Sequence, residues 1–168
     1  MSGLLLNCGS GQRPFAKPWI NIDAQARWEP DMVDDLKQPW PCKTGTAAMV
    51  VFHHVWEHEG CGEATAMQRE AFRVLQPGGS MLVFVPDLRA LAQRWLLGQI
   101  DTQVYMTNLY GAFMGDDHDR HRWGYDLASL RRELEACPWA EVKPFDWRRI
   151  PGADLARDWW VLAMEAVR

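Results

Sequence analysis

At 168 residues the chain has the length of one domain, and 48% hydrophobic against 24% charged residues is typical of a folded globular domain rather than a disordered segment. The formal net charge of −4, with lysine and arginine scattered among acidic residues, argues against a nucleic-acid partner, which needs a basic surface to neutralise phosphates. No apolar stretch approaches the length of about 18 residues that predicts a membrane-spanning helix.

The first two predicted elements are short apolar strands. Gly3–Asn7 leads into a glycine-rich turn, and Trp19–Asp23 ends on a carboxylate. Only seven residues follow Gly11 before the second strand, and two of them are prolines. A crossover between parallel strands usually needs about ten to twelve residues including its helix. We therefore expect the first crossover helix to be truncated to one turn at most.

The middle of the chain predicts a strand–helix–strand unit. Met32–Leu36 is a short third strand, and Ala47–Phe52 is a fourth strand that is apolar throughout. A helix over about Glu63–Leu75 follows, because its apolar residues recur at every third or fourth position. Pro77-Gly78-Gly79 ends that helix and turns the chain, and Ser80–Val85 is the fifth strand.

The remainder of the chain predicts further helices and two closing strands. The helices are Leu88–Leu97, Thr102–Leu109 and one that starts with Asp126 as its N-cap and extends to about Cys137; the strands are Ala140–Trp147 and Trp159–Val167. Strands that alternate with helices indicate an α/β domain with a mostly parallel sheet, closed by an antiparallel C-terminal pair. We predict a single domain over residues 1–168.

Polar residues follow the ends of the predicted parallel strands. They are Asn7-Cys8-Gly9-Ser10-Gly11, Asp23, Asp35 and His53-His54. In open parallel sheets, ligands bind beyond the carboxyl ends of the strands, where the chain order reverses. A glycine turn lets backbone amides approach a ligand, and a carboxylate after the second strand can accept from both hydroxyls of a ribose. Taken singly, the turn is equally consistent with an ordinary tight turn, and Asp23 with a helix cap.

Several stretches, in order, resemble the class I S-adenosylmethionine-dependent methyltransferases. They are LLLNCGSGQ, WINID, DDL, VVFHHVWEH and REAFRVLQPGGSMLVFVPD, which together span Leu4 to Asp87. The similarity is greatest to the short, type-11-like predicted methyltransferases, and a weaker similarity extends to about Cys137. VLQPGGSMLVFVPD is the most specific stretch, because it joins a helix end, a turn and a strand. The resemblance implies a Rossmann-like methyltransferase fold and S-adenosylmethionine as cofactor.

The resemblance also implies which residues bind the cofactor. They are Asn7, Cys8, Gly9, Ser10, Gly11, Asp23, Asp35, Leu36, His53 and His54. The backbone amides of the glycine turn would serve the carboxylate of the methionine part, and Asp23 would hold the ribose hydroxyls. Asp35 and the Leu36 amide would contact the adenine, while the two histidines would stand near the sulfonium.

Two positions depart from the pattern of the family. Gln12 stands where a third glycine is expected, and Asn7 replaces the acid often found at the end of the first strand. The neutral Asn7 can still hydrogen-bond the ammonium group of the cofactor or the turn itself. Both departures bear on the affinity for the cofactor.

Methyl transfer to an oxygen benefits from a general base, and a histidine near a carboxylate suits that role. The candidate bases are His54, His118 and His121. The last two belong to the polar stretch Gly115–His121, which is also typical of a solvated loop. Its place after the fifth strand, where this fold carries acceptor-binding insertions, favours a role in catalysis.

A metal site is not predicted. Several possible ligands are close in sequence, namely His53, His54, His58, Glu59 and Cys61. However, adjacent histidines on a strand point to opposite faces, and no second cluster supplies a fixed ligand spacing. We expect Glu57 and His58 instead to cap or orient the start of the following helix.

The sequence therefore favours methyl transfer from S-adenosylmethionine to an oxygen or nitrogen atom of a small molecule or glycan, the glycan resting on the resemblance alone. The stretch 88–125 is the candidate acceptor-binding insertion. A weak or inactive methyltransferase fold that acts as a binding or scaffold module stays open, whereas the short first crossover disfavours a nicotinamide-dependent oxidoreductase. The absence of a signal-peptide pattern and of CxxC pairs predicts a cytoplasmic protein with reduced thiols.

Overall fold

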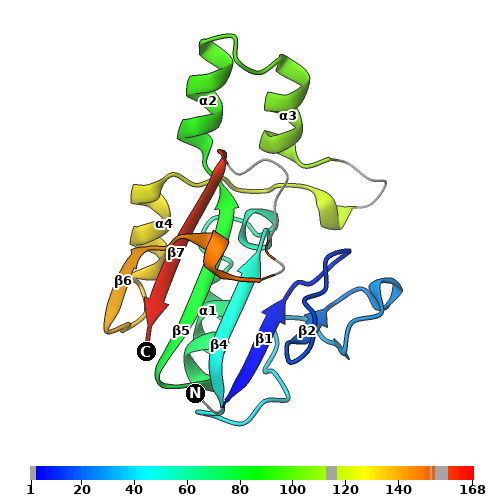
Figure 1. The fold of residues 1–168 in the computed structure, drawn as a ribbon, viewed down its shortest axis with the longest axis vertical. Helices are drawn as coiled ribbons and strands as arrows, with labels where there is room; N and C mark the ends of the chain where they lie inside the picture. The colour runs from blue at the N-terminus through cyan, green and yellow to red at the C-terminus, as the bar shows by residue number, and fades with distance from the viewer. Residues whose placement is uncertain (1–2, 113–116, 152, 154–158) are drawn as a thin grey trace.

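A computed structural model describes residues 3–112, 117–151, 153 and 159–168 (Figure 1). Its strands form a seven-stranded sheet in the order β3-β2-β1-β4-β5-β7-β6. Their bounds are β1 Leu4–Cys8, β2 Ile20–Asp23, β3 Met32–Val33, β4 Ala47–His53, β5 Leu75–Pro86, β6 Glu141–Pro144 and β7 Val161–Val167. Strands β1 to β5 are parallel, and β7 pairs antiparallel with both β5 and β6. The predicted fold class, a Rossmann-like, mostly parallel sheet with an antiparallel C-terminal pair, is confirmed.

The helices lie close to the predicted positions. The α-helices are α1 Thr65–Val74, α2 Leu88–Leu96, α3 Thr102–Tyr110 and α4 Leu127–Leu134, and the 3-10 helices are η1 Ala26–Trp28, η2 Trp56–His58, η3 Asp117–Asp119 and η4 Trp147–Arg149. Asp126 is the N-cap of α4, as predicted: its carboxylate accepts from the Ser129 amide at 2.8 Å, while its own amide donates to Ser129 Oγ. This reciprocal capping box fixes where α4 begins.

Two strands end earlier than predicted, and an aspartate turn follows each of them. The third strand stops at Val33 and the sixth at Pro144. The Asp35 carboxylate accepts a hydrogen bond from the amide two residues on, and the Asp146 carboxylate does the same at the start of η4. Such aspartate turns compete with continued strand pairing.

The Pro77-Gly78-Gly79 segment is part of β5, whereas the sequence predicted a turn that separates helix from strand. The pairing with β4 is nevertheless irregular there, since Ala47 pairs with Leu75 but Met49 already pairs with Ser80. Gly78 has φ +77°, a value that glycine adopts without strain. The helix thus ends close to the expected residue, whereas the strand begins five residues earlier than predicted, at Leu75, and its pairing is irregular across the predicted turn.

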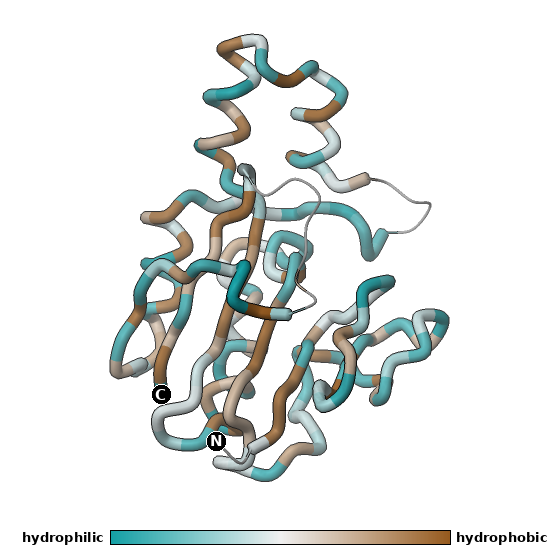
Figure 2. Tube along the Cα trace, in the orientation of Figure 1, coloured by the Kyte–Doolittle hydropathy of each residue, from teal (hydrophilic) through white to brown (hydrophobic). Residues whose placement is uncertain are grey.

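Different layers cover the two faces of the sheet. On one face, α1 and α4 pack over the central strands, and the fully buried Gln68 of α1 donates to the Leu134 carbonyl of α4 at 2.6 Å. On the other face the aromatic residues Phe15, Trp19 and Trp147 cover the strands, and among the described residues no α-helix contributes to this second cluster. The crossover between β1 and β2 forms turns without a helix, as its length predicted. Figure 2 shows the apolar residues concentrated along the central strands.

Helices α2 and α3 stand together beyond the carboxyl end of the sheet (Figure 1). The rings of Trp95 and Tyr105 stack between them with centroids 4.9 Å apart. Asp87 caps α2 by accepting from the amides of the second and third residues that follow it. Of the helices in the described ranges, none combines the length and the apolar character needed to cross a membrane.

Candidate functional site

The glycine turn after β1 is bound to the end of β2. The amides of Gly9 and Ser10 donate to the Ile22 carbonyl at 2.7 and 3.1 Å, and the Gly11 amide donates to Asp23 Oδ2 at 2.8 Å. The other carboxylate oxygen of Asp23 accepts from the amide two residues on. The structure therefore brings the turn and Asp23 into direct contact, with the turn amides engaged inside the protein. Each Asp23 oxygen keeps a second lone pair for a further donor.

Two buried polar atoms beside this turn have no hydrogen-bond partner within the described part of the chain. They are Asn7 Oδ1 and Ser10 Oγ. Asn7 itself is anchored, because its Nδ2 donates to Asn21 Oδ1 at 2.9 Å. Buried polar atoms without partners are rare and costly in folded proteins, so this pair is a natural place for ligand contacts. The Cys8 side chain is different: it lies in the helix-covered core, and only its backbone can face a ligand.

The end of β4 carries the two adjacent histidines. The prediction that their side chains point to opposite faces is wrong, since the ring centroids lie 5.1 Å apart. The reason is that His54 leaves the strand with φ +59°, a left-handed conformation that redirects its side chain. Its amide still donates to the Phe84 carbonyl at 3.0 Å, which holds this sparsely populated conformation in place.

His53 is buried between Phe15 and Phe84, on the face of the sheet that the aromatic residues cover. Burial, and to a smaller extent the neighbouring His54, lowers the pKa of His53 to about 3. His53 is therefore neutral at physiological pH, and its buried Nε2 has no partner in the described structure.

Glu57 lies at the centre of a histidine cluster, which the sequence did not predict. The expected cap of the next helix is wrong: Glu57 is in η2, its side chain is 1% exposed, and Oε1 lies 2.8 Å from His54 Nδ1. Burial by itself would raise the pKa of Glu57, but the charge and hydrogen bond of His54, with smaller effects of His58 and His121, lower it to about 2. An ionised carboxylate is thus held inside the protein by imidazole groups.

His121 comes to this cluster from far along the chain. The Glu57 carbonyl accepts from the amides of Arg122 and Trp123 at 2.8 and 3.2 Å, which fixes this later segment against η2. The rings of His58 and His121 meet edge to face at 4.9 Å. Burial is the largest cause that lowers the pKa of His121, which favours the neutral imidazole.

The other residues predicted from the resemblance lie elsewhere. Asp35 is exposed, and Leu36 packs into the helix-side core while its carbonyl accepts from Trp40 Nε1 at 2.9 Å. His118 lies in η3 with an exposed side chain, outside the group of side chains around Glu57. Residues 113–116, part of the predicted acceptor-binding stretch and of the polar stretch before His121, lie outside the described residues.

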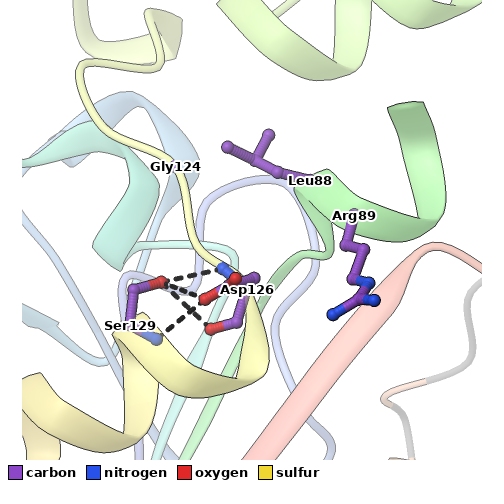
Figure 3. Close-up of a pocket in the computed structure, with 5 residues that line it drawn as sticks. All are labelled: Leu88, Arg89, Gly124, Asp126 and Ser129. Atoms are coloured by element: carbon purple, nitrogen blue, oxygen red, sulfur yellow. Dashed lines mark hydrogen bonds between the residues drawn. The ribbon is translucent and has the colours of Figure 1, made fainter. Parts of the chain in front are cut away.

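A pocket of about 400 Å³ lies near the N-terminal ends of α2 and α4 (Figure 3). It is lined by Leu88, Arg89, Gly124, Asp126 and Ser129. The close-up shows Arg89 on α2 facing the Asp126–Ser129 capping box across the pocket. Three of the five lining residues belong to the stretch 88–125 that the sequence predicts to bind the acceptor.

Comparisons with known proteins show which solved structures share this fold. Neither protein-family models nor curated proteins gave a match to the sequence. Among solved structures, the chain is similar to a methyltransferase of Thermotoga maritima described as a possible histamine N-methyltransferase (14% identity, TM-score 0.63, 98% of this chain and 82% of that one). It is also similar to an S-adenosylmethionine-dependent methyltransferase of Archaeoglobus fulgidus (12% identity, TM-score 0.65, 99% and 86%).

A further similar structure is a possible exported protein from Bordetella parapertussis (13% identity, TM-score 0.62). That protein is longer, since the match covers 99% of this chain but 62% of the other. The similarities extend over nearly the whole chain at low identity. The protein therefore has the fold of the class I S-adenosylmethionine-dependent methyltransferases.

Proposed function

We propose that this protein transfers a methyl group from S-adenosylmethionine to an oxygen or nitrogen atom of a small molecule or glycan. The observation that carries the proposal is the pair formed by the half-buried His54 and the buried Glu57 after the carboxyl end of β4, next to the glycine turn of β1. Parallel sheets bind their ligands at this reversal point, and a base in the same place would meet the group that receives the methyl.

The residues around the turn fit the cofactor. Asn7 Oδ1 is a buried acceptor without a partner, which suits an ammonium group, and Asp23 has free lone pairs for ribose hydroxyls. Ser10 Oγ is a further buried polar atom that a ligand would satisfy. Gln12 is exposed at the surface of the turn and leaves these groups unobstructed. S-adenosylmethionine, when bound, supplies a sulfonium-activated methyl group whose displacement releases a neutral thioether.

His54 is the proposed general base. In the neutral form of His54, Nδ1 carries the proton of that bond, because the ionised Glu57 only accepts hydrogen bonds, and Nε2 keeps a lone pair. Nε2 is buried and has no partner among the described residues, so a hydroxyl or amine that reached it would gain a hydrogen bond. General bases contribute rate factors of about 10² to 10⁴. His121 and His118 are the remaining candidates, and the His121 ring packs against His58 of the cluster.

Holding the acceptor atom in line with the methyl group would supply most of the rate enhancement that the base does not. Holding a nucleophile in line with a reactive carbon contributes roughly 7–11 kcal/mol in well-oriented systems. The pocket between α2 and α4 supports the stretch 88–125 as the place where the acceptor binds.

We also propose a cytoplasmic setting, which the four free cysteines support, since secreted domains usually pair theirs.

One observation favours the alternative, a scaffold that keeps the fold without turnover. The amides of Gly9, Ser10 and Gly11 already have partners inside the protein, so they would have to exchange them to bind a carboxylate. A scaffold needs no such exchange. The two proposals differ in whether methyl transfer occurs at all.

Calorimetric titration of the intact chain with S-adenosylmethionine and S-adenosylhomocysteine tests cofactor binding. Saturable binding that weakens in Asp23→Asn supports the proposal, and an absence of binding overturns it. Transfer of a labelled methyl group into hydroxyl- and amine-bearing acceptors, monosaccharides among them, then separates enzyme from scaffold. Turnover that is lost in His54→Gln identifies the base, whereas cofactor binding without transfer to any acceptor favours the scaffold.

A further inference from the structure

We infer that Glu57, His58 and His121 form a binding site for a divalent transition-metal ion of the zinc class. One potential ligand atom from each residue lies within 4.8 Å of the others. Two imidazoles and a carboxylate are a common ligand set for zinc and its first-row neighbours. The inference goes beyond the proposed function, because metal binding requires neither the cofactor nor the acceptor.

The two histidines have the tautomer that a ligand needs. His121 Nδ1 lies 2.9 Å from the Asn108 carbonyl, and His58 Nδ1 lies 3.3 Å from the Arg120 carbonyl. Carbonyl oxygens only accept, so in both rings Nδ1 carries the hydrogen and Nε2 keeps the lone pair. Metal-binding histidines in proteins are oriented in this way, by donating the other ring N–H to a carbonyl or carboxylate.

Glu57 supplies the second, independent indication of a ligand. Its side chain is 1% exposed, and Oε1 is taken by His54, but Oε2 is buried with no partner in the described residues. A buried carboxylate oxygen without a partner is costly unless a cation or a donor reaches it. A metal ion bound to Oε2 would leave the Oε1–His54 hydrogen bond in place. The site and the proposed base therefore coexist.

The backbone holds the ligands near the spacing that an ion requires. Zinc bonds to nitrogen and oxygen are about 2.0–2.2 Å long, so ligand atoms around one ion lie about 3–4 Å apart. The ligand atoms, which lie within 4.8 Å of one another, would have to approach by about 1 Å to bind one ion. The Arg122 and Trp123 amides on the Glu57 carbonyl fix the two chain segments that carry the ligands.

The site differs from the cluster weighed from the sequence. Among those neighbours, Glu59 pairs with Lys37 at 3.2 Å, and Cys61 is exposed and outside the group. The missing ligand was His121, which tertiary contacts alone bring to Glu57. Three protein ligands leave a coordination position for water or a substrate oxygen, as in catalytic rather than structural zinc sites.

The test uses the intact chain after treatment with a chelator and removal of the chelator. Titration with Zn²⁺ by calorimetry, and with Co²⁺ by its visible absorption, should give one ion per chain. His58→Ala and His121→Ala should each weaken binding by at least about 10- to 100-fold, the loss found even for residues that only support a ligand. His118→Ala, a histidine of the same segment outside the group, is the matched control and should bind as the unchanged chain does.

Thermal melts keep the test interpretable if a variant folds poorly. Bound metal should raise the melting temperature of the unchanged chain and of His118→Ala, but not of His121→Ala. No stoichiometric binding by the intact chain would overturn the inference. Binding that survives in both His58→Ala and His121→Ala would overturn it as well, because the ion would then lie elsewhere. Neither outcome depends on methyl transfer, so the two proposals can fail separately.

Discussion

Val55 lies directly against Gly9, and no side chain fits between the turn after β1 and the turn after β4. A Cβ added at Gly9 would lie 2.4 Å from Val55 Cγ2, and Gly9 has φ +72°. This contact, rather than a helix, sets how close the proposed cofactor turn comes to the histidine cluster. Gly11 shares the left-handed conformation, with φ +46°, but a Cβ there would meet nothing within 4 Å.

The two glycines make a matched pair of variants. Gly11→Ala should lose about 1–2 kcal/mol of unfolding free energy, the cost of a left-handed alanine. Gly9→Ala should lose about 1–3 kcal/mol more, because overpacking against Val55 is added. Urea unfolding measures both changes. Adding Val55→Ala to Gly9→Ala should recover the excess, and equal losses in the two single variants would contradict the close contact.

Asp23 should decide the affinity for the cofactor. Asp23→Asn removes the charge and keeps one oxygen for the Gly11 amide, but it gives up the hydrogen bond from the Gln25 amide to the other carboxylate oxygen. Loss of charged hydrogen bonds of about 1.5–3 kcal/mol corresponds to roughly 10- to 100-fold weaker binding of S-adenosylmethionine. Calorimetry measures this, with circular dichroism as the check on folding. Glu135→Gln, at the exposed end of α4, is the control. Unchanged affinity in Asp23→Asn would mean that Asp23 stabilises the glycine turn and does not bind the cofactor.

His54 and Glu57 should affect turnover and leave cofactor binding unchanged. His54→Gln removes the base and should lower kcat by about 10² to 10⁴. Glu57→Gln keeps the shape but removes the charge that stabilises the imidazolium formed when His54 takes a proton. We expect a smaller loss there, together with a displaced pH profile of kcat. Steady-state rates across pH check this, and a loss of cofactor affinity instead of kcat would argue against a base.

His53 should make the folded state sensitive to mild acid. Burial lowers the pKa of His53 to about 3 in the folded protein, below the ordinary value of 6.5 that applies to the unfolded chain. Between these values the unfolded chain takes up a proton that the folded chain does not, so stability is lost as pH falls through this window. The slope is at most about 1.4 kcal/mol per pH unit.

We expect His53→Phe, which keeps an aromatic ring beside Phe15 and Phe84, to flatten the fall in melting temperature between pH 6.5 and 4.5. The lowered pKa of His121 acts in the same direction within this window, so we expect the slope to be reduced and not abolished. The lowered pKa of Glu57 is felt only below its ordinary value of 4.5. Melts of His118→Gln, an exposed histidine, should keep the slope of the unchanged chain. An undiminished slope in His53→Phe would place its origin in another group.

Local patterns in the sequence were enough to predict which segments form the strands of the sheet. The apolar runs predicted the strands, and the short first crossover with its prolines predicted a helix of one turn at most, because each pattern depends on residues close in sequence. The turn predicted at Pro-Gly-Gly lies inside β5 instead. Strand lengths were less predictable, since the aspartate turns at Asp35 and Asp146 compete with strand pairing. Structural similarity at 12–14% identity then agreed with the fold.

The arrangement of the histidine cluster could not be predicted from the sequence, and the reasons are physical. The left-handed conformation of His54 depends on the Phe84 carbonyl, and the approach of His121 depends on the Glu57 carbonyl. Both are tertiary contacts that no periodicity encodes. The three-residue spacing of His54 and Glu57 was the one available signal, because a tight turn places such residues on the same side.

The position of β7 has a consequence for synthesis of the chain. It is the last strand in chain order, yet it lies inside the sheet between β5 and β6. Until residues 161–167 have emerged from the ribosome, β5 presents an unpaired edge and β6 has no partner. The nascent chain is therefore exposed to edge-to-edge association up to that point, and folding of the sheet is completed only after translation of its final strand.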